Sequence, residues 1–249
     1  MLEGLFNGER WKALFSSDVL ETFVDGFYMT LWIAVFGILL ALTIGIIFGL
    51  MSTSKLKILR IIARVYVEFF QNTPLVVQVF FYWAGLPKLL KILFQTKRVV
   101  RIPKTTLGIM SVGLYHGAYV AEVIRTGLEA VPKGQYEAAY SQGFTRMQAM
   151  RYIVLPQTLK IILPPLTNQA LNLVKNTSVL ALIAGMDLMY QADVFVSKTG
   201  YLQGYLLCAV MYFIICFPLS VAARKFEQRQ KNPPKVKKSK QNLLQKEVD

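Results

Sequence analysis

The stretch Gly26–Ser54 reads GFYMTLWIAVFGILLALTIGIIFGLMSTS and contains no charged residue. A helix that crosses a bilayer needs about 20 mainly apolar residues, because each residue adds only about 1.5 Å along the axis. The stretch meets this requirement. Acidic residues such as Glu21 and Asp25 precede it, whereas a signal peptide begins with a positively charged segment. We therefore predict a membrane-spanning helix that remains in the mature protein.

Four further stretches are also long, apolar and almost free of charged residues. Phe69–Pro87, Thr105–Ala121 and Thr199–Ala223 contain no charged residue, and Ile161–Met186 contains only Lys175. The composition agrees, because 54% of the 249 residues are hydrophobic and only 17% are charged. A soluble domain of this length does not bury so much apolar surface. The sequence predicts an all-α integral membrane protein with five transmembrane helices.

The basic residues between these spans indicate an orientation. Cytoplasmic loops carry an excess of Lys and Arg, and here the excess follows the first, third and fifth spans. We therefore expect the amino terminus outside and the carboxyl terminus inside, although the basic segment Leu86–Lys104 then lies outside. This divides the chain into an extracytoplasmic segment (1–25), a transmembrane domain (26–226) and a basic, disordered cytoplasmic tail (227–249). The tail either remains solvated or contacts anionic lipid headgroups.

The positions of individual residues argue against several classes of function. The formal net charge of +14 does not indicate nucleic-acid binding, because the basic residues lie at membrane edges and in the tail. Cys208 and Cys216 lie inside the fifth span and His116 is the only histidine, so we expect no metal site and no redox chemistry. We also find no set of catalytic partners at one membrane depth. An enzyme is therefore not expected.

The loop between the third and fourth spans contains a spaced pattern. Its residues are Glu137, Ala138 and Ala139, then Gly143, then Ile153, and finally Leu155 and Pro156. Proline after Val131 suits the start of a helix, and Gly143 suits its end. The small alanines permit close approach to a partner, and Pro156 predicts a second turn before the chain re-enters the membrane. The pattern predicts a short helix outside the bilayer.

This spacing resembles the EAA signature of the membrane subunits of bacterial ABC importers. The resemblance implies a type I ABC importer permease fold in which the short helix is a coupling helix, docked on a cytoplasmic ATPase subunit. It also implies a second permease subunit, identical or homologous, and an extracytoplasmic substrate-binding protein. The chain contains no Gly-Lys dipeptide and hence no phosphate-binding loop. We expect no cofactor on this chain, with ATP and Mg²⁺ bound by the partner. A solvated loop without a partner is the alternative.

Other stretches are similar to the polar amino-acid permeases within that superfamily. They are Tyr66–Phe81, Ala118–Gly127, Val131–Gly134 and Asn168–Leu180. The family typically has arginine where this chain has Gln71, so no role of a cation is carried over to that position. The resemblance implies the bacterial cytoplasmic membrane as the location and a polar amino acid as the cargo.

Asn72, Thr73 and Pro74 interrupt the start of the second span. Proline inside a helix leaves a backbone carbonyl without its partner, and broken helices at membrane depth often form transport sites. We predict that these three residues line the substrate pathway. The alternative is a packing kink near the inner surface.

The fourth span contains amides and one cation, which are Gln169, Asn172, Lys175, Asn176 and Thr177, preceded by Asn168. Residues 168, 172 and 175 share one face at helical spacing, and 169, 172 and 176 share an adjacent face. A lysine at the centre of a bilayer costs about 2.5–3.5 kcal/mol, so Lys175 should face the protein interior or a wet cavity. These residues are our main candidates for the substrate pathway. Hydrogen bonding between subunits is the alternative.

Glu68, Glu122 and Arg125 lie near the cytoplasmic ends of the second and third spans. Ion pairs between these side chains can close an inner gate. Alternatively, the side chains simply extend from the membrane edge into water. Because Gln169 and Asn176 are neutral where relatives that import cations tend to carry carboxylates, we expect glutamate, glutamine or aspartate as cargo. A cationic amino acid or cystine is the first alternative. A channel or sensor that works without ATP is the second.

Overall fold

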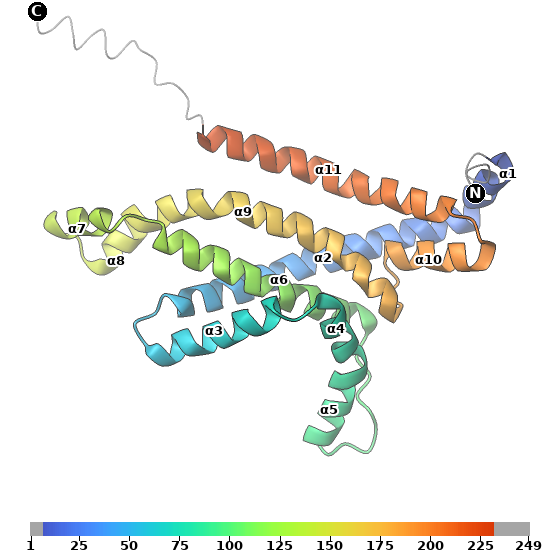
Figure 1. The fold of residues 1–249 in the computed structure, drawn as a ribbon, viewed down its shortest axis with the longest axis horizontal. Coiled ribbons are helices and arrows are strands. Elements are labelled where there is room, and N and C mark those ends of the chain that lie inside the picture. Colours follow the sequence, from blue (N-terminus) through green and yellow to red (C-terminus); the bar gives the residue numbers. More distant parts are fainter. Residues whose placement is uncertain (1–6, 232–249) are drawn as a thin grey trace, which may run out of the picture.

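The computed structural model describes residues 7–231, which form helices and no strand, as the all-α prediction requires (Figure 1). The α-helices are α1 (Gly8–Leu14), α2 (Ser17–Ser52), α3 (Lys57–Gln71), α4 (Leu75–Phe80), α5 (Leu86–Leu93), α6 (Lys104–Glu129), α7 (Lys133–Ser141), α8 (Arg146–Ala149), α9 (Leu155–Asn176), α10 (Leu188–Thr199) and α11 (Gln203–Lys231). Two π-helical turns, η2 (Phe81–Gly85) and η3 (Met150–Val154), follow α4 and α8, and the 3-10 helix η4 (Thr177–Ile183) follows α9.

Within residues 7–231, four helical segments are long and apolar enough to cross a membrane. They are Ser17–Ser52, Leu75–Leu93, Lys104–Glu129 and Gln203–Lys225. A fifth span arises if Arg146–Ile183 and α10, which bend by 45° at a short break, are taken together. The structure therefore supports four or five spans, in agreement with the predicted five-helix membrane fold.

One predicted boundary is corrected by the structure, at the start of the tail. Helix α2 begins at Ser17, before the predicted span Gly26–Ser54, and Asp18 lies in its first turn, where the helix dipole favours an acidic residue. The division of the chain at residue 25 stays a prediction. Helix α11 continues to Lys231, beyond Phe226. The predicted disordered tail otherwise lies outside the described residues.

The turn predicted at Pro156 is also wrong. The helical chain runs without a break from Arg146 to Ile183, and Pro156 lies in the first turn of α9. The π-turn η3 directly precedes it, with the Leu155 amide bonded to the Met150 carbonyl five residues back. This wider turn accommodates a proline ring that would clash in a regular α-helix.

Small residues on α2 allow α6 to pack closely against it. Gly37, Ala41, Gly45 and Gly49 are buried at four-residue spacing along α2. A Cβ atom on Gly45 would overlap Val120 of α6, and one on Gly49 would lie 2.8 Å from Cβ of Ile124. Such stripes of small residues bring helix backbones together where no hydrophobic effect drives association. The α2–α6 contact is thus the centre of the bundle.

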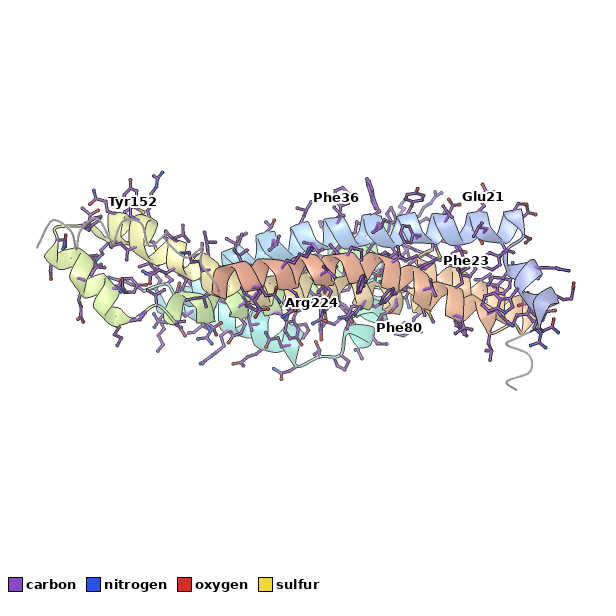
Figure 2. All side chains as sticks on the ribbon, turned by 90° about the horizontal axis from the view of Figure 1, so that it is seen from above. Glu21, Phe23, Phe36, Phe80, Tyr152 and Arg224 are labelled. Atoms are coloured by element: carbon purple, nitrogen blue, oxygen red, sulfur yellow. The ribbon has the colours of Figure 1, made fainter. Side chains whose placement is uncertain are left out.

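The outer surface of the bundle is apolar, as a membrane requires. Figure 2 shows Phe36 on the outer side of α2, where it is 39% exposed, and Phe23 on the side that faces α10 and α11, where it is fully buried. Lipid or another subunit must cover the exposed apolar face.

We expect Gly45→Val to lower the free energy of unfolding by about 1–3 kcal/mol, the usual cost of overpacking. The added side chain would meet Val120 and lie 3.2 Å or less from the Ala121 amide nitrogen, which cannot move without its helix. Denaturant unfolding in mixed micelles measures the change. The control is Ile46→Val, because the Ile46 side chain is 48% exposed. Equal stability of the two variants would contradict the close packing.

The connections gather at two ends of the bundle. Helices α7 and α8 lie with the α2–α3 turn at one end, and α1 lies with the α10–α11 turn at the other (Figure 1). Helices α4 and α5 turn away from the line of α3, so the basic segment after α5 lies beside the bundle. The other connections therefore alternate between the two ends of the bundle, as the predicted topology requires.

Candidate functional site

A single histidine joins two predicted pathway residues. His116 of α6 is 2% exposed and lies between Gln169 and Asn176 of α9. Its Nδ1 atom is 3.2 Å from Gln169 Oε1, and its Nε2 atom is 3.0 Å from Asn176 Nδ2. Gln169 and Asn176 are almost two full helical turns apart, so their side chains point to the same side. His116 was not among the predicted pathway residues, although a histidine in an uncharged span requires hydrogen-bond partners.

A cavity of about 230 Å³ adjoins this cluster. His116 and Gln169 form part of its wall together with Thr167, while residues such as Ile38 of α2 and Leu166 of α9 supply apolar surface. Tyr115 and Tyr119 of α6 hold the imidazole ring from its own helix, with ring centroids 5.3 and 6.2 Å away. Two of the three cluster residues, His116 and Gln169, therefore border a largely apolar cavity, which Asn176 does not line.

The other fourth-span candidates point elsewhere. Asn172 is exposed, whereas Gln169 and Asn176 are half-buried and lie within hydrogen-bond distance of His116. The place of Asn172 in the substrate pathway stays a prediction. Thr177 is buried, donates to the Val174 carbonyl and lies 3.3 Å from the Tyr212 hydroxyl. Asn168, Asn172 and Lys175 form an exposed polar face.

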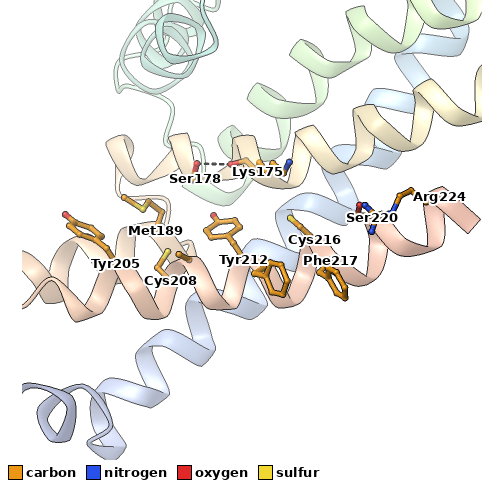
Figure 3. Close-up of a pocket in the computed structure, with 12 residues that line it drawn as sticks. Lys175, Ser178, Met189, Tyr205, Cys208, Tyr212, Cys216, Phe217, Ser220 and Arg224 are labelled. Atoms are coloured by element: carbon orange, nitrogen blue, oxygen red, sulfur yellow. Dashed lines mark hydrogen bonds between the residues drawn. The ribbon is translucent and has the colours of Figure 1, made fainter. Parts of the chain in front are cut away.

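Lys175 lines a cavity of about 680 Å³ between the fourth span and α11. Figure 3 shows Lys175 on one side of this cavity and Tyr212, Cys216 and Arg224 of α11 on the other. The Lys175 carbonyl accepts a hydrogen bond from Ser178, 2.8 Å away. The ammonium group thus has access to a cavity, as the cost of burying it in lipid requires.

The chain breaks at Asn72–Pro74, where α3 ends at Gln71 and α4 begins at Leu75. Asn72 donates to the Glu68 carbonyl at 2.7 Å, and Thr73 donates to the Phe69 carbonyl at 2.8 Å. Gln78, which is 5% exposed, donates to the Thr73 hydroxyl at 2.6 Å. These side chains satisfy backbone groups at the break, and their described hydrogen bonds do not extend to α9. Their role in the pathway stays a prediction.

The inner-gate candidates line one charged cavity of about 580 Å³ between α3 and α6. Arg125 pairs with Glu122 and Glu129 on its own helix, with Nε 3.0 Å from Glu122 Oε2. Glu68 pairs with Arg64 on α3 at 3.4 Å. The expected ion pair between the two spans is therefore absent from residues 7–231, because each charge has a partner one helical turn away. The gate itself stays a prediction.

The predicted coupling helix corresponds to α7, which carries Glu137, Ala138 and Ala139. Gly143 has a φ of 81°, and its amide bonds to the Tyr140 carbonyl, while the Phe144 amide bonds to the Ala139 carbonyl. These two bonds form a Schellman motif, in which a left-handed glycine ends the helix. Helix α8 then begins with a capping box between Thr145 and Gln148. The predicted helix end at Gly143 is confirmed.

The surface of this segment is open and partly apolar. Glu137 and Ala138 are exposed, whereas Ala139 is 2% exposed. Tyr140 is 45% exposed and Met147 is 75% exposed. Of the later motif residues, Ile153 is half-buried in η3, while Leu155 and Pro156 are exposed at the start of α9. Tyr152, also exposed, lies at the same end of the molecule (Figure 2). Such a surface suits a protein partner.

Comparisons with known proteins show which family the chain resembles. The profile of a family described as "Binding-protein-dependent transport system inner membrane component" matches residues 41–232. The chain is similar to the probable glutamine ABC transporter permease protein GlnM of Bacillus subtilis (strain 168), with 39% identity over 85% of this chain and 94% of that protein. It is 33% identical to the probable glutamine ABC transporter permease protein GlnP of the same organism, over 87% and 97% of the two chains.

Solved structures are also similar. A chain from the crystal structure of an amino acid ABC transporter with histidines is 34% identical, with a TM-score of 0.76 over 85% of this chain and 95% of that chain. A chain of the MetNI methionine ABC transporter, only 17% identical, shares the fold with a TM-score of 0.66 over 86% of this chain and 99% of that one. The chain therefore belongs to the family of binding-protein-dependent transport system inner membrane components.

Proposed function

We propose that the protein is the permease subunit of an ATP-driven importer that carries glutamine, or another polar amino acid such as glutamate or aspartate, across a bacterial cytoplasmic membrane. The observation that carries the choice of cargo is the pair of amides, Gln169 and Asn176, held on His116 inside a membrane-spanning bundle. Uncharged donors and acceptors at this depth are costly in lipid unless they have partners. They suit a polar cargo. Similar chains named as glutamine permeases support the same choice.

Helix α7 supports the role of a partner ATPase. It exposes Glu137 and Ala138 at one end of the bundle, beside apolar side chains such as Tyr140. The chain has no Gly-Lys dipeptide, so ATP and Mg²⁺ would bind to the partner. The permease would contribute no catalytic residue. Closure of the ATPase subunits would move α7 and, through η3, the continuous helix α9 that carries Gln169 and Asn176.

Two further partners complete the proposed importer. A second permease, identical or homologous, would cover the polar face formed by Asn168, Asn172 and Lys175, which lipid would not tolerate. An extracytoplasmic binding protein would deliver the amino acid to the other end of the bundle from α7. A cationic cargo is less well supported, because residues 169 and 176 carry no charge.

The experiment is uptake of labelled glutamine into vesicles that contain the permease with its ATPase and binding protein. We expect uptake that needs ATP and is reduced by an excess of unlabelled polar amino acids. Competition by arginine, lysine or cystine alone would assign the cargo to the first alternative class. ATP-independent flux of glutamine would indicate a channel, and uptake of none of these amino acids would contradict the proposal.

A further inference from the structure

The segment Leu86–Lys104 carries positive charge without a compensating negative charge. From Phe69 to Ala121 the chain contains no aspartate or glutamate. The basic residues in this range are Lys88, Lys91, Lys97, Arg98, Arg101 and Lys104. All of them are exposed, and none forms an ion pair with another residue of the described range 7–231. These charges therefore face outward without a partner in the described chain.

Large apolar side chains lie among these cations on and after α5. The exposed ones are Leu89, Ile92, Leu93 and Phe94. Ile92 is 74% exposed. Lys88 and Lys91 lie one turn apart on a neighbouring face of the same helix. Helix α5 is thus amphipathic, with a basic face and an apolar face, which is the composition of helices that lie at a membrane surface.

Local hydrogen bonds define the path of the chain after α5. Gln95 has a φ of 48°, and its amide bonds to the Ile92 carbonyl, while the Thr96 amide bonds to the Lys91 carbonyl. These two bonds form a Schellman motif. The Thr96 hydroxyl then donates to the Arg98 carbonyl at 2.9 Å. The turn sends the chain back toward α6, so the cations on α5 and after it belong to one surface beside the bundle (Figure 1).

Aromatic side chains precede the basic residues. Phe80, Phe81 and Trp83, at the end of α4 and in η2, are exposed. Tryptophan is enriched where a bilayer meets water, because its ring is apolar and its N–H group is polar. Water disfavours the exposed apolar groups and hydrocarbon disfavours the charges. The surface of a membrane satisfies both.

We propose that the basic segment Leu86–Lys104 binds anionic phospholipid headgroups at the membrane surface beside the bundle. Its lysine and arginine side chains pair with the negatively charged headgroups, and the apolar face of α5 contacts the acyl chains. Each basic side chain near an anionic membrane surface strengthens binding about fivefold. The inference depends on the membrane fold and not on which amino acid is carried.

The test is photolabelling of the permease–ATPase complex in nanodiscs that contain equal amounts of photoreactive phosphatidylglycerol and phosphatidylcholine. The two lipids share the photoreactive acyl chain, and only phosphatidylglycerol has a net negative charge. Peptide mass spectrometry gives the ratio of the two labels at each segment. We expect a ratio of at least about ten on residues 86–104. The internal reference is the exposed, uncharged face of α2 around Phe36, where the ratio should be about one.

The contribution of charge can be removed in two independent ways. In 1 M salt, where the Debye length is about 3 Å, the ratio on residues 86–104 should fall toward one without any substitution. At low salt, the double variant Lys91→Gln and Arg98→Gln should lower the ratio at least about fivefold. Because both side chains are exposed, their replacement leaves the packing of the bundle unchanged.

Two control variants separate the position of the charge from its amount. Lys91→Arg with Arg98→Lys retains both charges, so the ratio should equal that of the wild type. Lys12→Gln with Lys198→Gln removes two positive charges outside the segment, and Lys12 already pairs with Glu9 at 2.9 Å. This second control should also retain the wild-type ratio.

Three results would overturn the inference. The first is equal labelling of residues 86–104 by both lipids at low salt, or an unchanged ratio in the Lys91→Gln and Arg98→Gln variant. The second is the absence of both labels, which would show that protein covers the segment. The third is a binding protein that shields the segment from both lipids and binds this variant more weakly, which would assign the basic surface to a protein partner.

Discussion

Replacing Gly143 by valine should reduce ATP-driven uptake at least about tenfold while the chain remains in the membrane. Gly143 has a φ of 81°, which a β-branched residue adopts only at a cost of about 1–3 kcal/mol. A Cβ atom there would meet no other atom within 4 Å, so the strain acts on the backbone alone. Since about 1.4 kcal/mol corresponds to a tenfold change in an equilibrium, loss of the Schellman turn should displace α7 from the position in which we propose that it docks on the ATPase.

The measurement combines uptake with ATP hydrolysis in the same vesicles. We expect the ATPase partner to continue hydrolysing ATP, with little transport per ATP. The matched control is Gly134→Ala, because Gly134 lies within α7, where its Cβ would also meet nothing within 4 Å but no left-handed φ is required. Wild-type uptake by Gly143→Val would show that the end of α7 does not transmit the movement.

The double substitution Gln169→Glu and Asn176→Asp should change the preferred cargo from a neutral polar amino acid to a cationic one. Both new carboxylates would face His116, and the one at position 169 would also line the adjoining cavity. A hydrogen bond to a charged group contributes about 1.5–3 kcal/mol, so we expect a change of about tenfold or more in relative uptake of arginine over glutamine.

Competition between labelled arginine and glutamine, with a binding protein that accepts both, measures this change. The control is Asn168→Asp, which adds a carboxylate to the exposed face of the same helix, away from His116. An equal change in this control would attribute the effect to charge on α9 in general. If the double variant retains the wild-type preference, Gln169 and Asn176 do not contact the cargo.

The accuracy of the sequence predictions depended on the range of the interactions involved. The end of α7 at Gly143 was predictable, because a left-handed residue after a helix is a local backbone requirement. The break at Asn72–Pro74 was also predictable, because proline lacks the amide that a helix needs. The expected turn at Pro156 was wrong, since a π-turn can absorb a proline early in a helix and single-sequence patterns do not reveal this.

The predicted partners of the polar residues were less accurate. Glu68 and Arg125 carry opposite charges at the ends of adjacent spans, yet each pairs within its own helix, where a partner lies one turn away. Asn172 was grouped with Gln169 and Asn176 by helical spacing, but it is exposed, whereas the other two side chains are half-buried against His116. Helical spacing defines neighbours on one helix, whereas the face that meets another helix depends on packing.

The sequence by itself determined that Gly26–Ser54 and the other apolar stretches form membrane helices, because the cost of exposing polar groups to lipid acts on each stretch separately. It also determined the short helix that carries Glu137. Only the tertiary structure decided that His116 joins Gln169 and Asn176, since this contact depends on how α6 and α9 rotate and slide when small residues pack. Contacts between helices distant in the sequence follow from the shape of the whole bundle, which no local pattern contains.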